Sequence, residues 1–209
     1  MVAEKAVPEH FGKAMINAVS GFARTGIADA EKLDTKWFEH IKDDNVRSAI
    51  CDTFHGARWI YKVGLALLVE DKEQFAHVRA QVIDYGSICE TMLSEMISHG
   101  LQKNKFKGRQ FEHKFPSGNA KIQWSRFGDL SAAVRGQKFW WHIAVAKEEK
   151  IINSVLVTEL EALRKVRNTV HLTEKINSNT TYHLGMSARA LETLHKTINQ
   201  TKAWYNRNK

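Results

Sequence analysis

Apolar residues recur at three- and four-residue spacing along most of the chain, which is the pattern of amphipathic helices. The expected helices cover residues 10–22, 28–41, 44–65, 73–100, 127–146, 149–171 and 187–204. We expect Gly100 to mark the end of the fourth helix and Ser187 to cap the last, because glycine and serine favour these positions. With only two prolines in 209 residues, the pattern predicts an all-α fold.

The helical pattern lapses between residues 101 and 124. Pro116-Ser117-Gly118-Asn119 is a strong turn signal there, and short alternating runs flank it at residues 110–115 and 120–124. This predicts a basic hairpin or an ordered basic loop inserted between two helices. A second gap, INSNTTYHLG at residues 176–185, is predicted to be a polar loop.

The same segment carries much of the net charge of +8. Between residues 103 and 126, one acidic residue stands against seven basic ones: Lys103, Lys105, Lys107, Arg109, Lys114, Lys121 and Arg126. Aromatic residues alternate with these cations, which suits a single-stranded nucleic acid. We therefore predict that these seven residues bind RNA, with an ordinary solvated surface as the alternative.

The composition is that of an ordinary globular protein, with 43% hydrophobic and 26% charged residues. No apolar run approaches the roughly 18 to 20 residues of a membrane span, and residues 1–15 lack the apolar region of a secretory signal. Cys51 and Cys89 sit within apolar helical patterns, which predicts two buried thiols in a reducing compartment. We expect a cytoplasmic protein without membrane contact.

The most informative stretch is LRKVRNTVH, residues 163–171, at the end of an expected helix. On a helical wheel the preceding apolar residues form one stripe, and four polar residues share one flank of it: Arg164, Arg167, Asn168 and His171. On a continuous helix His171 would lie one turn, or about 6 Å, beyond Arg167. A histidine can transfer protons near neutral pH and arginines bind phosphate, so the cluster suits phosphate chemistry. Alternatively, the arginines pair with acids and the histidine bonds to a loop carbonyl.

These residues resemble the signature of HEPN domains (higher eukaryotes and prokaryotes nucleotide-binding), an arginine followed by four to six residues and a histidine. Arg164 has this spacing from His171, and Arg167-Asn168 supplies the Arg-Asn pair often found inside the motif. The resemblance implies an antiparallel helical bundle over residues 73–209, with the motif on a late helix. Residues 1–72 would then form an N-terminal helical extension packed on the bundle.

The resemblance also implies a metal-independent endoribonuclease that leaves 2′,3′-cyclic phosphate ends and needs no cofactor. By this likeness His171 is the catalytic histidine, Arg167 and Arg164 bind the scissile phosphate, and Asn168 orients the phosphate or the histidine. Which arginine is the catalytic one stays open. A homodimer through the motif helix, a role as a toxin or anti-phage effector, and an antitoxin or activating partner are further implications.

Two other functions remain open from the sequence. One is a non-catalytic helical module that binds RNA or a protein, as a partner or inhibitor subunit. The other is a partner in a nucleotidyl-transfer toxin–antitoxin pair that is itself modified. Glycine-rich phosphate loops and the HExxH and CxxC metal motifs are absent from the sequence, so no metal is expected. For Phe139-Trp140-Trp141, burial is favoured over base stacking, and Tyr182 and His183 are weaker candidates for the cleft.

Overall fold

The computed structural model describes residues 12–106 and 128–209, and within these ranges it is helical without strands. The prediction of an all-α fold is confirmed. The helices are α1 (Lys13–Arg24), α2 (Ala30–Lys32), the π-helical turn η1 (Leu33–Trp37), α3 (Asp44–Ala66), α4 (Asp71–Gln102), α5 (Leu130–Arg135), α6 (Phe139–Glu148), α7 (Ser154–Asn168), α8 (Leu172–Ser178) and α9 (Leu184–Arg207).

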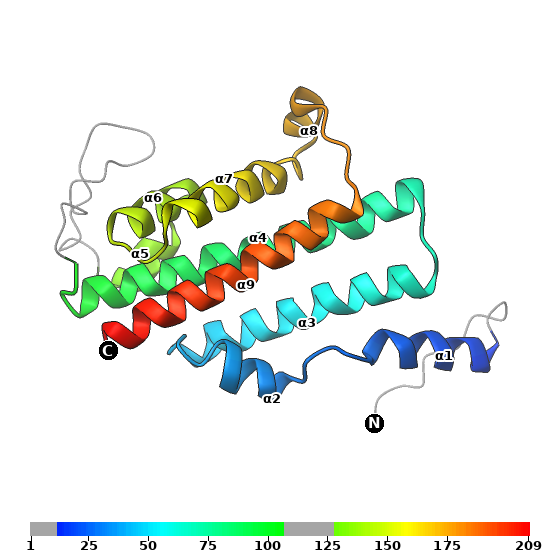
Figure 1. Ribbon diagram of the computed structural model, residues 1–209, viewed down its shortest axis with the longest axis horizontal. Helices are drawn as coiled ribbons and strands as arrows, with labels where there is room; N and C mark the ends of the chain where they lie inside the picture. Colours follow the sequence, from blue (N-terminus) through cyan, green and yellow to red (C-terminus); the bar gives the residue numbers. More distant parts are fainter. Residues whose placement is uncertain (1–11, 107–127) are drawn as a thin grey trace.

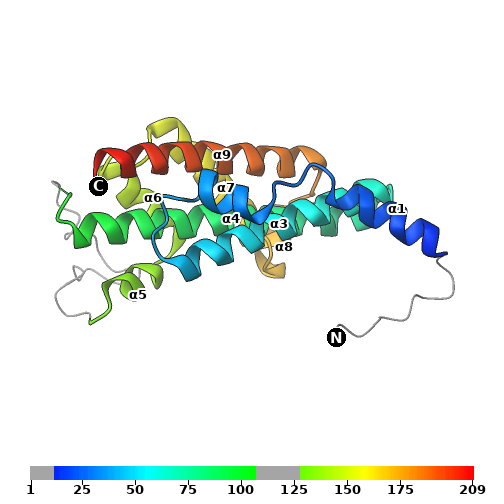
Figure 2. The same cartoon turned by 90° about the horizontal axis from the view of Figure 1, so that it is seen from below.

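The long helix α4 is the centre of the molecule and contacts α3, α5, α6, α7 and α9. Figures 1 and 2 show that α9 runs in the same direction as α4, whereas α3 and α7 run in the opposite direction. The short helix α8 projects from the bundle between α7 and α9, and α1 packs on α3. Because α4 touches α6, α7 and α9 at once, residues from well-separated parts of the sequence meet on its surface.

One hydrophobic core joins these helices, and it draws on α3 as well as on α4, α6, α7 and α9. Phe54 of α3 and Tyr85 of α4 are both buried, with their ring centroids 6.3 Å apart. Cys51 and Cys89 are buried free thiols, as the sequence predicted. The core thus spans the junction between residues 72 and 73, and the division of the chain at that point stays a prediction.

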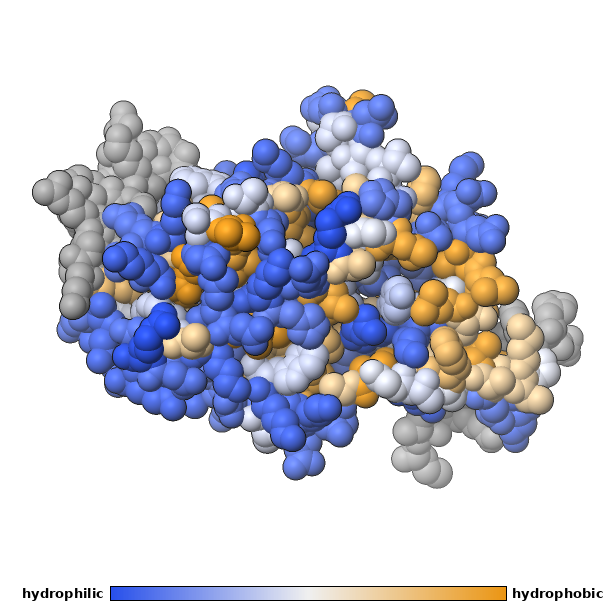
Figure 3. All heavy atoms as spheres, in the orientation of Figure 1, coloured by the Kyte–Doolittle hydropathy of each residue, from blue (hydrophilic) through white to orange (hydrophobic). Residues whose placement is uncertain are grey.

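The surface facing the viewer in Figure 3 is mostly hydrophilic. Apolar side chains gather at the end of the bundle where α3 connects to α4; the exposed Leu65 lies in the last turn of α3, and the exposed Leu67 and Leu68 lie in the connection. No helix within the described ranges is long and apolar enough to cross a membrane.

The helix expected over residues 127–146 is two helices, because the chain breaks after α5. The side chain of Asp129 caps α5 by accepting a bond of 3.0 Å from the backbone N–H of Ala132, and Gly136 ends it. Across the break, the buried His142 donates from Nε2 to the carbonyl of Val134 at 2.8 Å. Gly136 is only a weak signal for this break, since a glycine inside a helical pattern is often tolerated.

Two residues that were expected at helix ends, Ser187 and Gly100, lie inside their helices. The last helix begins at Leu184, and Ser187 is a buried residue inside it that donates a hydrogen bond to Gln81 of α4. Helix α4 continues past Gly100 to Gln102, and a side chain at position 100 would overlap with the ring of Phe106. In both cases tertiary packing, rather than helix capping, explains the residue.

The expected polar loop at residues 176–185 is partly helical, because α8 occupies Leu172–Ser178. It ends at Asn179, whose backbone is left-handed with φ 47°. Asparagine tolerates this conformation better than most residues. The hairpin or loop predicted at residues 110–124 lies outside the described residues.

Candidate active site

Helix α7 ends at Asn168, so His171 does not lie on it as the helical wheel assumed. The backbone N–H groups of Thr169, Val170 and His171 bond to the carbonyls three residues earlier, each at 3.1 Å. The chain therefore makes tight turns here, and His171 is the N-cap residue of α8. The prediction of a continuous helix to His171 is wrong.

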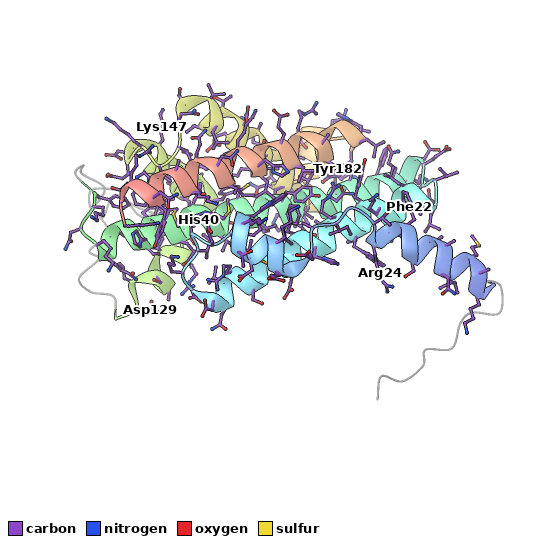
Figure 4. All side chains as sticks on the ribbon, turned by 60° about the horizontal axis from the view of Figure 1, so that its bottom comes forward. Phe22, Arg24, His40, Asp129, Lys147 and Tyr182 are labelled. Carbon is purple, nitrogen blue, oxygen red and sulfur yellow. The ribbon has the colours of Figure 1, made fainter. Side chains whose placement is uncertain are left out.

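Thr169 explains why the helix stops at this point. Its hydroxyl donates to the carbonyl of Val166 at 2.6 Å, so its oxygen accepts a bond of 2.5 Å from the hydroxyl of Tyr182. Both residues are buried, and Tyr182 is labelled in Figure 4 near the start of α9. On the other side, Arg79 of α4 donates to the carbonyl of Val170 at 3.2 Å. The turn before His171 is thus anchored by α4 and by the residue pair Thr169–Tyr182.

The four motif residues nevertheless line one open pocket of about 610 Å³. This volume is within the range of small-molecule sites. The lining residues come from α4, from α6 and the residue before it, from α7, and from α8 and the turn that leads into it: Ile83, Glu90, Lys138, Phe139, Trp140, Arg164, Arg167, Asn168, Val170, His171 and Glu174. The structure therefore brings together all four residues that the sequence singled out as catalytic, although His171 reaches the pocket from a different element.

Arg167 is held in one position from several sides. Its Nη1 lies 2.5 Å from Oε2 of Glu90, and its guanidinium carbon is 5.6 Å from the ring centroid of Phe139. Its aliphatic part packs on Gly86 of α4, where an added Cβ would lie 3.1 Å from the arginine Cδ. An oriented guanidinium of this kind can present its remaining N–H donors to an anion.

Glu90 is a carboxylate in a largely buried place. Burial raises its pKa, while the neighbouring Arg167 acts in the opposite direction. His142 lies nearby, with Nδ1 at 3.9 Å from Oε1 of Glu90, but burial lowers the pKa of this histidine to about 4. The imidazole of His142 is therefore neutral at pH 7, and the charge partner of Glu90 is Arg167.

Arg164 pairs with Glu161 one turn earlier on α7. Its Nε and Nη2 lie 2.9 and 2.8 Å from Oε2 of that carboxylate. Lys138, Asn168 and His171, in contrast, have no side-chain hydrogen bond or ion pair with any residue that the structure describes. The pocket thus combines two arginines, each paired with an acid, with three polar groups that are free to meet a ligand.

Of the seven predicted RNA-binding residues, the structure describes Lys103 and Lys105, and neither lines this pocket. Lys103 and Lys105 follow the C-terminal end of α4, and Lys103 lies about 20 Å beyond Glu90 along the helix axis. Five further residues lie outside the described residues: Lys107, Arg109, Lys114, Lys121 and Arg126. Tyr182 and His183 do not line the pocket, although Tyr182 supports the turn that forms one side of it.

Among the residues that line the pocket, the sequence pattern did not single out Glu90, Lys138 or Glu174. The burial expected for Phe139-Trp140-Trp141 is confirmed for Phe139 and Trp141 but is wrong for Trp140, which is 37% exposed. A signal existed for Glu90, since it is the lone acid between the buried Cys89 and Met92. A carboxylate in such surroundings needs a cationic partner. The positions of Lys138 and Trp140 at the pocket depend on the break after α5, and the sequence pattern did not predict this break.

Within residues 12–106 and 128–209, no three histidine, cysteine, aspartate or glutamate side chains lie close enough to share a metal ion. The chain matches no protein-family model, no curated protein and no solved structure. The resemblance to HEPN domains accordingly rests on the motif residues themselves.

Proposed function

We propose that this protein is a metal-independent endoribonuclease of the HEPN type. The observation that carries the proposal is the pocket that His171, whose imidazole has no partner among the described residues, lines together with Asn168, Arg164 and Arg167. Two guanidinium groups beside a histidine are suited to a phosphodiester, because they stabilise charge on its oxygens while the imidazole transfers a proton.

The proposed reaction uses the 2′-hydroxyl of the RNA as the nucleophile. A bond forms between this oxygen and the adjacent phosphorus, the bond from phosphorus to the 5′-oxygen of the next nucleotide breaks, and a 2′,3′-cyclic phosphate remains. His171 takes the proton from the 2′-hydroxyl or gives one to the leaving 5′-oxygen. Arg167 and Arg164 bind the phosphate oxygens, and Asn168 orients the phosphate or His171. The reaction consumes no metal ion or cofactor.

A homodimer through α7 is part of the proposal. Within one chain, a single histidine in the pocket serves one of the two proton transfers, and a second copy would supply another imidazole. On the pocket side of α7, Asn168 is exposed and Arg164 is half-buried. A second copy that packs against this side would bring its own imidazole to the pocket, whereas the exposed Val155, Thr158, Ala162 and Lys165 lie on the other side of the helix. A cytoplasmic toxin or anti-phage effector, with an antitoxin or activating partner, follows from the family resemblance alone.

A non-catalytic module that binds RNA or a protein is the second candidate, and one observation favours it. Both arginines already have acidic partners, Arg167 with Glu90 and Arg164 with Glu161. Such pairs are also what a purely structural role would require.

Incubation with RNA in the presence of EDTA separates the two candidates. The wild type should cut single-stranded RNA and leave 2′,3′-cyclic phosphate ends, whereas His171→Ala and Arg167→Ala should lose at least about 100-fold in rate. Lys165→Ala is the matched control, since this exposed cation lies on the same helix but does not line the pocket. RNA with 2′-O-methyl groups should resist cleavage because it lacks the nucleophile.

Binding without cleavage under these conditions would support the second candidate and end the nuclease proposal. Cleavage by both pocket variants at the wild-type rate would show that the activity belongs to another site.

A further inference from the structure

Three adjacent aromatic residues at the start of α6 have different environments. Phe139 and Trp141 are buried, with 4% and 1% of their surfaces exposed, because α6 packs against α4 and α7. Trp140 lies between them in sequence but is 37% exposed, and it lines the pocket with the motif residues. Successive residues of a helix point about 100° apart, so the core cannot take up all three rings. A large aromatic side chain is therefore available beside the proposed phosphate site.

Lys138 precedes α6 and lines the same pocket. Of the acids at the pocket, Glu90 pairs with Arg167 and Glu161 pairs with Arg164, whereas Glu174 of α8 has no cationic partner among the residues that the structure describes. Lys138 has no acidic partner among the residues that the structure describes. It is thus the cation whose charge is left for a ligand, and it stands two residues from the exposed indole.

A pocket with this charge balance attracts a polyanion only moderately, because two of its three cations pair with neighbouring acids and Glu174 adds a further negative charge. Stacking of a base on an aromatic ring changes nucleic-acid affinity by an amount similar to that of a phosphate contact. Only an unpaired base can stack on a protein ring, since the bases of a duplex are stacked on one another. An aromatic ring beside a phosphate site therefore selects single strands.

We propose that Trp140 and Lys138 form a nucleotide-binding subsite that makes this pocket specific for single-stranded RNA. The base stacks on the indole of Trp140, and the ammonium group of Lys138 binds a neighbouring phosphate. That the ligand is RNA rests on the proposed function. The subsite adds that the substrate of the proposed reaction is single-stranded.

The test measures RNA binding separately from cleavage. In the His171→Ala protein, the affinity for a fluorescein-labelled single-stranded RNA and for its duplex is followed by fluorescence anisotropy. The single strand should bind at least about tenfold more tightly than the duplex. Adding Trp140→Ala should weaken binding of the single strand by about fivefold to 100-fold, and Trp140→Phe should retain most of the affinity. Adding Lys138→Ala should lower the salt dependence by about one phosphate contact.

Trp59→Ala is the matched control, because Trp59 is a similarly exposed tryptophan, at 42%, that does not line the pocket. Far-UV circular dichroism checks that each variant is folded. The inference is overturned if Trp140→Ala binds the single strand like the Trp59→Ala control, or if the duplex binds as tightly as the single strand.

A different result would refute the proposed nuclease activity. If the wild type binds single strands through Trp140 but does not cut them, the subsite stands and the catalytic proposal falls. If the wild type cuts RNA while Trp140→Ala changes neither the affinity nor the preference for single strands, the catalytic proposal stands and the subsite is refuted.

Discussion

Replacing His142 by glutamine should remove a large part of the acid sensitivity of this fold. His142 is buried, and its Nε2 donates to the carbonyl of Val134 at 2.8 Å across the break between α5 and α6. Burial lowers its pKa from the ordinary 6.5 to about 4. Glutamine places an amide N–H donor near the position of Nε2 but does not titrate.

The sign and the size of this effect of pH on stability follow from proton linkage. The unfolded chain binds a proton at this histidine below about pH 6.5, whereas the folded chain stays neutral until about pH 4. Stability is therefore complete above the unfolded pKa and falls as the pH drops from 6.5 towards 4. Between pH 7 and pH 5 the expected loss is about 2 kcal/mol, taking 1.36 kcal/mol for each unit of pKa difference.

Urea unfolding at pH 7 and pH 5, followed by far-UV circular dichroism, measures this loss. The wild type should lose about 2 kcal/mol more than His142→Gln between the two pH values. His40 is also buried with a pKa lowered to about 4, so both proteins should keep a further acid-dependent loss from that residue. The exposed His55 provides the control for a change from histidine to glutamine, and His55→Gln should show the same loss as the wild type. Equal losses in wild type and His142→Gln would refute the reasoning.

Three further changes test the site. Gly86→Ala should displace Arg167, because the Cδ of Arg167 would lie 3.1 Å from the new Cβ, and the rate of RNA cleavage should fall. Alanine itself stabilises the helix by about 1 kcal/mol relative to glycine. A large loss of stability in urea unfolding would therefore contradict a local effect on Arg167. Thr169→Val removes the contacts to the Val166 carbonyl and the Tyr182 hydroxyl. It should cost about 1 to 3 kcal/mol in the same measurement, with slower cleavage, and an unchanged stability would show that the turn does not depend on them. Lys103→Ala should weaken RNA binding equally for all sequences, as measured by anisotropy at several salt concentrations, and should not change the cleavage positions.

The fold class and most of the long helices could be predicted from the sequence, because three- and four-residue spacing of apolar residues is a local property. Helices α3, α4 and α9 agree with the expected ranges to within a few residues at most ends. The failures have tertiary causes. Ser187 looked like a helix cap but is a core residue bonded to Gln81, and Gly100 looked like a helix end but makes room for Phe106.

The meeting of the four motif residues in one pocket could be predicted from the sequence, but the elements that bring them together and the other lining residues could not. A helical wheel placed His171 beside Arg167, and the two residues do line one pocket, yet they do so from different elements. The wheel could not anticipate the turn, because the bond between Thr169 and Tyr182 joins residues 13 positions apart. Glu90, which orients Arg167, lies on α4, far from the motif in sequence. Contacts of this kind depend on how helices pack rather than on the pattern within any one of them.

The two ion pairs indicate different roles for the two arginines in the proposed reaction. Glu161 and Arg164 are neighbours on one helix, and their side chains are 34% and 23% exposed. Pairs of this type contribute only about 0 to 1 kcal/mol, so a phosphate can displace Glu161 at little cost. Glu90 is less exposed and lies on a different helix, and removing it from Arg167 would leave a carboxylate without its counter-charge in a largely buried place. Arg167 should therefore keep Glu90 and offer its free N–H groups from a fixed position, while Arg164 exchanges Glu161 for the phosphate.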